Sequence, residues 1–196
     1  MRVTNLPNVL TIARIVAVPL VVALFYWDHP WSNPLAASVF IAAAITDSLD
    51  GYLARKLGIT TPLGEFMDPV ADKLMVATAL VLLVGHDTRA LIVVTAIVII
   101  GREIAVSALR EWMAQLGARA KVAVSGMGKL KTIMQMTGLS MMMFRNDLFG
   151  LPIYNIGVVL LVFAAGLTLW SMGSYMRAAW PELRRAPNPR YTDPDP

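Results

Sequence analysis

Four aspartates stand in segments that are otherwise largely apolar: Asp47 and Asp50, followed by Asp68 and Asp72. Spacings of three and four residues put each pair on one face of a helix. The connection between the two helices is short, near residues 58–62, so the pairs lie at a similar depth on antiparallel neighbours. We therefore expect the four carboxylates to converge on one point.

Four ionised carboxylates at one point would repel each other unless something balances their charge. Protonation, arginine or lysine partners, and divalent cations could each do so. The sequence has no cysteine and only two histidines. Hard oxygen ligands favour Mg²⁺, or Mn²⁺ as an alternative, over zinc. A pair of such ions is a recurring device for displacement at phosphorus. The plainer alternative is that the acids only cap helices or form ion pairs.

The composition indicates the medium that surrounds these acids. Of 196 residues, 57% are hydrophobic and 15% are charged, whereas a soluble domain averages roughly 25% charged residues. This composition argues against a soluble globule, a disordered chain and a nucleic-acid-binding arm. A membrane-spanning helix needs about 20 residues. We expect an all-α integral membrane protein with six transmembrane helices, at residues 8–27, 34–56, 62–85, 89–114, 128–145 and 151–178.

The basic residues predict the orientation of the six helices. One side of the expected topology, which carries both termini, holds Arg2, Arg55, Lys56, Arg119, Lys121, Lys129, Lys131, Arg177, Arg184, Arg185 and Arg190. The other side holds Arg89 and Arg145. The positive-inside rule places the termini, and with them the four aspartates, near the cytoplasmic side. We expect one membrane domain over residues 1–186, no cleaved signal peptide, and a disordered cytoplasmic tail over residues 187–196.

The aspartates belong to a longer pattern. Residues 47–55 read D-x-x-D-G-x-x-A-R, and after a gap of eight residues, residues 64–72 read G-x-x-x-D-x-x-x-D. All eight fixed positions of this signature are filled, and in this respect the chain resembles the CDP-alcohol phosphatidyltransferases. The resemblance implies a six-helix membrane enzyme, usually a homodimer, that moves a phosphatidyl group from a CDP-lipid to an alcohol and releases CMP.

The resemblance also implies roles for the four acids. Asp47, Asp50 and Asp68 would bind two metal ions. Because the ligands are oxygens, Mg²⁺ is the expected ion. Asp72 would be a ligand of the second ion and also the base that takes the proton of the acceptor hydroxyl.

A further set of residues is expected to contact the CDP-lipid. The resemblance implies this contact for Gly51, Arg55 and Thr61, in the signature and the following loop, and the small Ala54 lets a bulky ligand approach. In the first helix, Asn8, Thr11 and Arg14 share one face at its cytoplasmic end and could reach the CDP phosphates. Helix capping is the alternative explanation for Asn8 or Thr11 alone.

The acceptor site is expected on the fourth and fifth helices. Residues 5–14, 102–114 and 122–136 resemble the members of the family that use sn-glycerol 3-phosphate. That acceptor carries a phosphate dianion and needs cationic partners, for which Arg102, Arg110, Lys129 and Lys131 are the candidates. A solvated, positive-inside surface would also account for the lysines, and an ion pair with Glu103 or Glu111 would account for Arg102.

Three alternatives stay open. The signature is shared by enzymes that use other alcohols, such as serine or inositol phosphate. A membrane prenyltransferase also holds a diphosphate with aspartates and Mg²⁺, and a divalent-cation transporter could use the same acids. The favoured prediction is an enzyme of the bacterial inner membrane that uses CDP-diacylglycerol and glycerol 3-phosphate.

Overall fold

The computed structural model describes residues 6–57, 62–115 and 126–185, except for some side chains near the helix ends. This part of the chain forms six helices and contains no strand longer than an isolated bridge. In chain order they are α1 (Leu6–Phe25), α2 (Ser32–Leu57), α3 (Pro62–His86), α4 (Ala90–Gln115), α5 (Gly126–Phe144) and α6 (Ile153–Arg185).

The expectation of an all-helical protein is confirmed, and each helix falls on one predicted segment. The largest difference is at α6, which continues to Arg185 although the apolar segment was expected to end near residue 178. Apolarity limits a membrane span but not a helix, and residues 177–185 include alanine, glutamate, leucine and arginine, which are good helix formers. The expected tail, residues 187–196, lies outside the described residues, as do residues 58–61 and 116–125.

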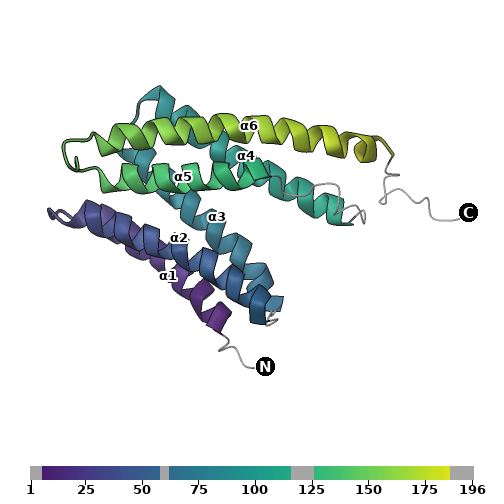
Figure 1. Cartoon of the computed structure of the whole chain (residues 1–196), viewed down its shortest axis with the longest axis horizontal. Coiled ribbons are helices and arrows are strands. Elements are labelled where there is room, and N and C mark those ends of the chain that lie inside the picture. The colour runs from purple at the N-terminus through teal and green to yellow at the C-terminus, as the bar shows by residue number, and fades with distance from the viewer. Residues whose placement is uncertain (1–5, 58–61, 116–125, 186–196) are drawn as a thin grey trace, which may run out of the picture.

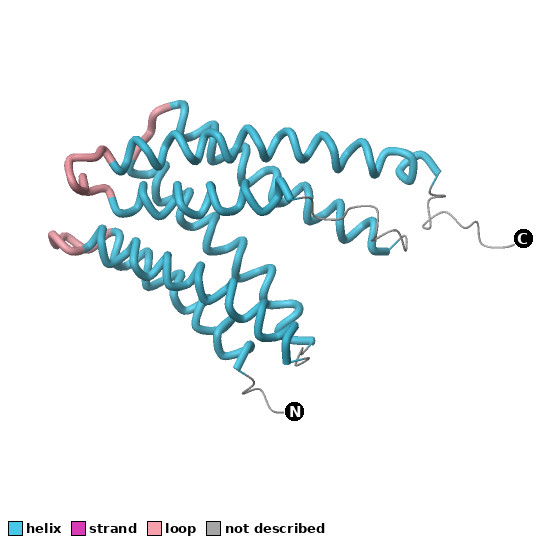
Figure 2. The backbone as a smooth tube through the Cα atoms, viewed as in Figure 1, coloured by secondary structure: helices cyan, strands magenta, loops and turns pink. Residues whose placement is uncertain are grey.

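The helices form two groups (Figure 1). The first group is α1, α2 and α3, in which α1 packs against both partners. The second is α4, α5 and α6, in which α6 packs against the other two. Contacts of α3 with α4 and α5, and of α2 with α5, join the groups. The groups meet near the α1–α2 and α5–α6 loops and diverge toward the end where α1 begins and α6 ends (Figure 2).

The described helices bury apolar side chains between them and also present apolar side chains outward. Phe40, Leu83 and Leu139 are fully buried in the shared core. Large apolar side chains on the outside include Val81 and Ile97, which are 62% and 63% exposed. A helix that is apolar on both faces suits a lipid environment rather than water.

Two helices are long and apolar enough to cross a membrane, within the residues that the structure describes. They are Ala90–Met113 in α4 and Ile153–Gly173 in α6, and Val9–Phe25 in α1 is a shorter apolar helix. Charged residues interrupt the apolar character of α2 and α3, among them the four aspartates. The charges that mark the candidate site therefore also weaken the membrane signal of the helices that carry them.

Candidate functional site

Side chains of α1 contact two of the aspartates, one on α2 and one on α3. The hydroxyl of Thr11 donates a hydrogen bond to Oδ1 of Asp68 at 2.5 Å, and Arg14 forms an ion pair with Asp47, with Nη1 2.5 Å from Oδ1. Thr11 and Arg14 are buried, with exposed fractions of 1% and 2%. Their spacing of three residues puts both on the face of α1 that meets α2 and α3. Helix α1 thus supplies a hydroxyl and a cation to carboxylates on two other helices.

The carboxylates of α2 and α3 are near one another. Asp47 and Asp68 are close enough for their charges to interact. Asp72, one turn after Asp68, is exposed, and it lies within electrostatic reach of Asp47 and Arg14. The structure therefore brings Asp47, Asp68 and Asp72 to the same end of the bundle, as the spacing predicted.

The groups of this cluster that could bind a cation are carboxylate oxygens. Among the described residues, no three histidine, cysteine, aspartate or glutamate side chains already form a metal site, and the Asp50 side chain lies outside the described residues. Asp47 and Asp68 each use Oδ1 in the contact with α1. A carboxylate has about four lone-pair positions, so one such contact leaves room for a cation. Carboxylates without nitrogen or sulfur ligands fit Mg²⁺ in their chemistry.

Several predicted site residues cannot be assigned contacts. The backbone of α2 is helical through Gly51, Ala54 and Arg55, but the side chains there are outside the described residues. The same is true of the side chains of Asn8, Arg110 and Lys129. Thr61 lies outside the described residues altogether. Their predicted roles stay predictions.

A second polar cluster joins α4, α5 and α6. Oε1 of Glu103 accepts hydrogen bonds from Nη1 of Arg102 at 2.9 Å and from Nζ of Lys131 at 3.0 Å. A second guanidinium nitrogen of Arg102, Nη2, lies 3.4 Å from Oγ of Ser171 in α6. Arg102 and Lys131 are both buried, with exposed fractions of 9% and 3%. Two of the four predicted acceptor-binding cations are thus brought together.

The two clusters are adjacent. Asp72 of α3 lies within electrostatic reach of Glu103 of α4 as well as of Asp47. The site therefore has a carboxylate part, formed by α1, α2 and α3, and a cationic part, formed by α4, α5 and α6. Asp72, the predicted base, belongs to the carboxylate part and is within electrostatic reach of Glu103 in the cationic part.

Two residues of this site were not expected from the sequence. The sequence suggests Glu103 only as a partner of Arg102, and it gives no signal for Ser171. Glu103 follows Arg102 directly, which suggests a local pair, while its contact with Lys131 depends on how α4 packs near α5. The sequence signal for Glu103 is a carboxylate next to a cation within an otherwise apolar segment, where ionisable groups are costly and usually functional.

An apolar groove opens between α2 and α5. Its volume is about 600 Å³. It is lined by Ile41, Ala44, Ile45, Thr132, Ile133, Met136, Thr137, Ser140 and Met141. The groove begins close to Asp47 along α2 and directly after Lys131 along α5. An apolar chain could lie in it beside both polar clusters.

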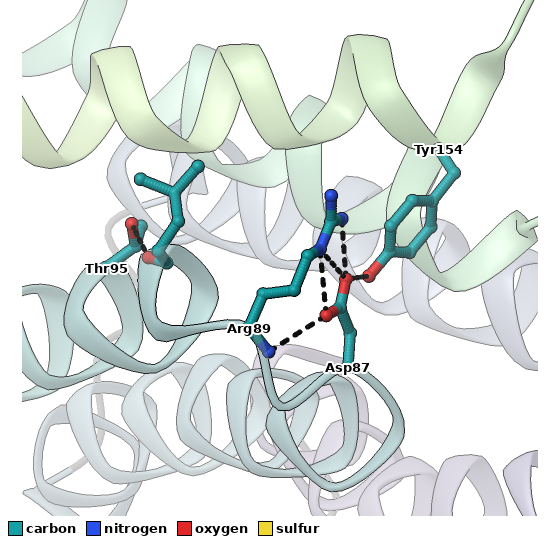
Figure 3. Close-up of polar contacts among 5 residues, drawn as sticks. Asp87, Arg89, Thr95 and Tyr154 are labelled. Carbon is teal, nitrogen blue, oxygen red and sulfur yellow. Dashed lines mark hydrogen bonds and ion pairs between the residues drawn. The ribbon is translucent and has the colours of Figure 1, made fainter.

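The opposite end of the bundle is held by a separate polar contact (Figure 3). Asp87 accepts hydrogen bonds from Arg89, with Nη2 at 2.7 Å from Oδ2, and from the hydroxyl of Tyr154 at 2.7 Å. The hydrogen bonds from Arg89 and Tyr154 hold the pKa of Asp87 well below its usual range, against a smaller opposing effect of burial. Nearby, the guanidinium of Arg145 lies 4.2 Å from the ring centroid of Phe25. These contacts join the α3–α4 loop to α6 and join α1 to the α5–α6 loop.

The fold and the site together define a class of protein: an all-helical bundle with apolar outer surfaces and a carboxylate-rich polar site among the helix ends, the arrangement of an enzyme that works at a membrane. The sequence identifies the family. The sequence model described as CDP-alcohol phosphatidyltransferase matches residues 4–170. The chain belongs to this family, which is a family of membrane enzymes.

Individual relatives are similar over nearly the whole chain. A CDP-diacylglycerol–glycerol-3-phosphate 3-phosphatidyltransferase of Pseudomonas fluorescens is 50% identical over 92% of this chain and 92% of its own length. A protein of the same name from Shigella flexneri serotype 5b is 45% identical over 91% of this chain and 97% of its own. A cardiolipin synthase (CMP-forming) of rice is 46% identical over 91% of this chain, which spans 58% of that protein.

A solved structure has the same fold. The apo crystal structure of Mycobacterium tuberculosis phosphatidylinositol phosphate synthase superposes with a TM-score of 0.66 and covers 91% of each chain. The two sequences are 20% identical, so this similarity concerns the arrangement of the helices alone.

Proposed function

We propose that this protein transfers the phosphatidyl group of CDP-diacylglycerol to sn-glycerol 3-phosphate, which gives phosphatidylglycerol phosphate and CMP. The observation that carries the proposal is the 50% identity, over 92% of both chains, to a relative named for this reaction. The complete signature at residues 47–72 supports the same chemistry.

The metal site is part of the proposal. Asp47, Asp50, Asp68 and Asp72 would hold two Mg²⁺ ions, with Mn²⁺ as the alternative, and the oxygen donors described above suit either ion. When bound, these ions would neutralise the diphosphate and stabilise the charge on the transferring phosphoryl oxygens. Thr11 and Arg14 orient Asp68 and Asp47 by the contacts that α1 makes with them.

The chain's own residues carry the proton and position the reactants. Asp72 takes the proton of the 1-hydroxyl of glycerol 3-phosphate, and its exposure allows the acceptor to reach it. The resulting oxygen forms a bond to the phosphorus that bears diacylglycerol. The bond from that phosphorus to the oxygen of CMP breaks, and CMP leaves with the electron pair. This is a single in-line displacement.

The two substrates would occupy different parts of the site. The CDP-lipid contacts Gly51, Ala54, Arg55, Thr61, Asn8, Thr11 and Arg14. One acyl chain can follow the groove between α2 and α5, which is apolar and begins beside Asp47. The acceptor phosphate is bound by the cations Arg102, Arg110, Lys129 and Lys131. Arg102 and Lys131 lie together at Glu103, which is within electrostatic reach of Asp72, and this position beside the predicted base supports the assignment. The ion pair of Arg102 with Glu103 is also the contact that the alternative explanation of Arg102 predicted.

The site would face the cytoplasm from within the bacterial inner membrane. The outward-facing apolar side chains of the described helices support burial in lipid. The excess of basic residues on the side of the termini supports the orientation. In this arrangement all six helices cross the bilayer, the acyl chains stay in lipid, and the acceptor and cytidine arrive from water. A homodimer is proposed on the family resemblance.

A second candidate is cardiolipin synthesis, favoured by the 46% identity to the rice enzyme. Cardiolipin carries two phosphatidyl groups on one glycerol, so the acceptor would then be phosphatidylglycerol rather than glycerol 3-phosphate. The buried cations of α4 and α5 favour an acceptor that carries a phosphate dianion. Serine and inositol phosphate are further acceptors of the same chemistry.

The test is an acceptor panel with the detergent-purified protein. CDP-diacylglycerol and Mg²⁺ are supplied with one acceptor at a time: glycerol 3-phosphate, phosphatidylglycerol, serine, inositol phosphate or glycerol. Released CMP is measured, and the lipid product is identified by its mass. We expect phosphatidylglycerol phosphate with glycerol 3-phosphate, and loss of CMP release in EDTA that Mg²⁺ restores. A product with another acceptor alone would contradict the acceptor assignment. Pyrophosphate release from a prenyl donor, or metal uptake by vesicles that contain the protein, would contradict the assignment as a phosphatidyltransferase.

A further inference from the structure

Glu103 is the meeting point of two buried cations from different helices. One oxygen, Oε1, accepts from Nη1 of Arg102 at 2.9 Å and from Nζ of Lys131 at 3.0 Å. The Glu103 side chain is 28% exposed, whereas the Lys131 side chain is 4% exposed. A buried ammonium or guanidinium group is costly unless a charge or hydrogen bond compensates it. Glu103 supplies that compensation to both.

The guanidinium of Arg102 is held from two sides. Its Nη1 donates to Glu103, and its Nη2 lies 3.4 Å from Oγ of Ser171. That hydroxyl donates in turn to the carbonyl oxygen of Thr168 at 2.9 Å. The plane of the guanidinium is therefore set by α4 and α6 together, and Glu103 extends this arrangement to Lys131 on α5.

Other anions lie nearby and could compete for these cations. Asp72 is within electrostatic reach of Glu103 and also of Asp47, and Asp47 interacts with Asp68. Without the charge of Glu103, the flexible Lys131 side chain would be attracted toward these carboxylates. The acceptor site would then lose the Lys131 ammonium group, and this group would compete with the metal ions for the carboxylates.

We propose that Glu103 is a positioning residue of the acceptor subsite, which keeps Arg102 and Lys131 directed at the acceptor phosphate and away from Asp47, Asp68 and Asp72. This inference rests on the proposed function. Glu103 itself does not contact the reacting atoms. It acts through the two cations, so its removal affects the binding of the acceptor and not that of the CDP-lipid.

The test uses Glu103→Gln, which keeps the shape of the side chain and removes its charge. The matched control is Glu111→Gln, the same substitution at an exposed position of the same helix. The full-length protein is assayed in detergent with Mg²⁺, and KM is measured separately for glycerol 3-phosphate and for CDP-diacylglycerol. In Glu103→Gln we expect the KM for glycerol 3-phosphate to rise about tenfold, the effect of one lost charge-assisted hydrogen bond. The KM for CDP-diacylglycerol stays within about twofold, and the control changes neither value.

A double-mutant cycle shows whether Glu103 acts through Lys131. In a Lys131→Met background, Glu103→Gln should raise the KM for glycerol 3-phosphate by less than about threefold, because the shared contact is already gone. If Glu103→Gln does not fold, Glu103→Asp replaces it. That variant keeps the charge on a shorter side chain and should give a smaller rise.

Several results would overturn the positioning role. One is an unchanged or lowered KM for glycerol 3-phosphate; a lowered value would mean that Glu103 competes with the phosphate. Another is an equal rise for both substrates, which a purely structural residue would give. If the unmodified protein releases no CMP with glycerol 3-phosphate, the proposed function itself has failed, and this outcome is distinct from the others.

Discussion

The hydroxyl of Thr11 in α1 donates a hydrogen bond of 2.5 Å to Oδ1 of Asp68 in α3. Thr11 is 1% exposed, so this contact belongs to the interior of the bundle. One turn further along α1, Arg14 pairs with Asp47 of α2. The first helix, which carries no part of the aspartate signature, therefore fixes one carboxylate on each of the two helices that do.

The first prediction concerns this hydrogen bond. Thr11→Val keeps the shape of the side chain and removes the donor to Asp68. The Mg²⁺ concentration for half-maximal CMP release should rise at least about tenfold, since partners that orient metal ligands typically contribute 10–100-fold to metal affinity or activity. Thr95→Val is the matched control, because the buried Thr95 hydroxyl donates within its own helix, to the carbonyl of Leu91 at 2.6 Å. An equal Mg²⁺ requirement in the two variants would contradict the role of Thr11.

The second prediction concerns the packing of α5 on α6. A Cβ atom added at Gly138 would lie 2.9 Å from the carbonyl oxygen of Gly157 and 3.1 Å from the backbone nitrogen of Leu161. Backbone atoms cannot move aside easily, and overpacking costs about 1–3 kcal/mol. Gly138→Ala should therefore lower the thermal unfolding midpoint in detergent by several degrees.

The control for this prediction is Gly166→Ala in α6, where an added Cβ would meet nothing within 4 Å. That variant should be neutral or slightly more stable, because alanine favours the helix. A drop in the midpoint for Gly166→Ala that matches the drop for Gly138→Ala would show that the close approach of the two helices is not the cause.

The third prediction concerns the contact at the opposite end of the bundle. Tyr154→Phe removes the hydrogen bond of 2.7 Å to Asp87, at a cost of about 1 kcal/mol. The melting midpoint should fall by a few degrees, whereas Tyr26→Phe, at a side chain that is 72% exposed, should leave it unchanged. CMP release per folded molecule should stay the same in both variants, because the contact is distant from the carboxylates.

The pH dependence of this contact follows from the lowered pKa of Asp87. A carboxyl group with a lowered folded-state pKa adds stability above its unfolded pKa of about 3.9, and that stability is lost as the pH falls toward the folded-state pKa. The difference between the native protein and Tyr154→Phe should therefore be the same at pH 8 and pH 5. A difference that disappears at pH 5 would contradict the assignment.

The sequence predicted the helices well because apolar runs and proline breakers report directly on local structure. It also predicted that Asp47, Asp68 and Asp72 would be neighbours, since helical spacing and one short loop determine their placement. The partners of these acids depend on packing between distant segments. The sequence suggests that Thr11 and Arg14 contact the CDP phosphates. It does not report their contacts with Asp68 and Asp47, because these contacts require α1 to pack on both α2 and α3.

The contacts of Glu103 also depend on packing between helices that the local sequence does not report. Adjacent opposite charges in a helix suggest a local pair, which the structure contains as the contact with Arg102. The second contact, with Lys131, joins α4 to α5 across 28 positions of sequence. No local pattern reports on it, and only the arrangement of α4, α5 and α6 reveals that the two predicted cations share one carboxylate.

The most direct test of the central claim is the rate of CMP release in Asp72→Asn. The purified variant is compared with the unmodified protein and with Asp28→Asn, an exposed position outside the helices, in CDP-diacylglycerol, glycerol 3-phosphate and Mg²⁺. Loss of a general base typically costs 10²–10⁴-fold. We predict a fall of at least about 100-fold for Asp72→Asn with an unchanged melting midpoint, and full activity for Asp28→Asn. Full activity in Asp72→Asn would contradict the assignment of this carboxylate as the base of the transfer.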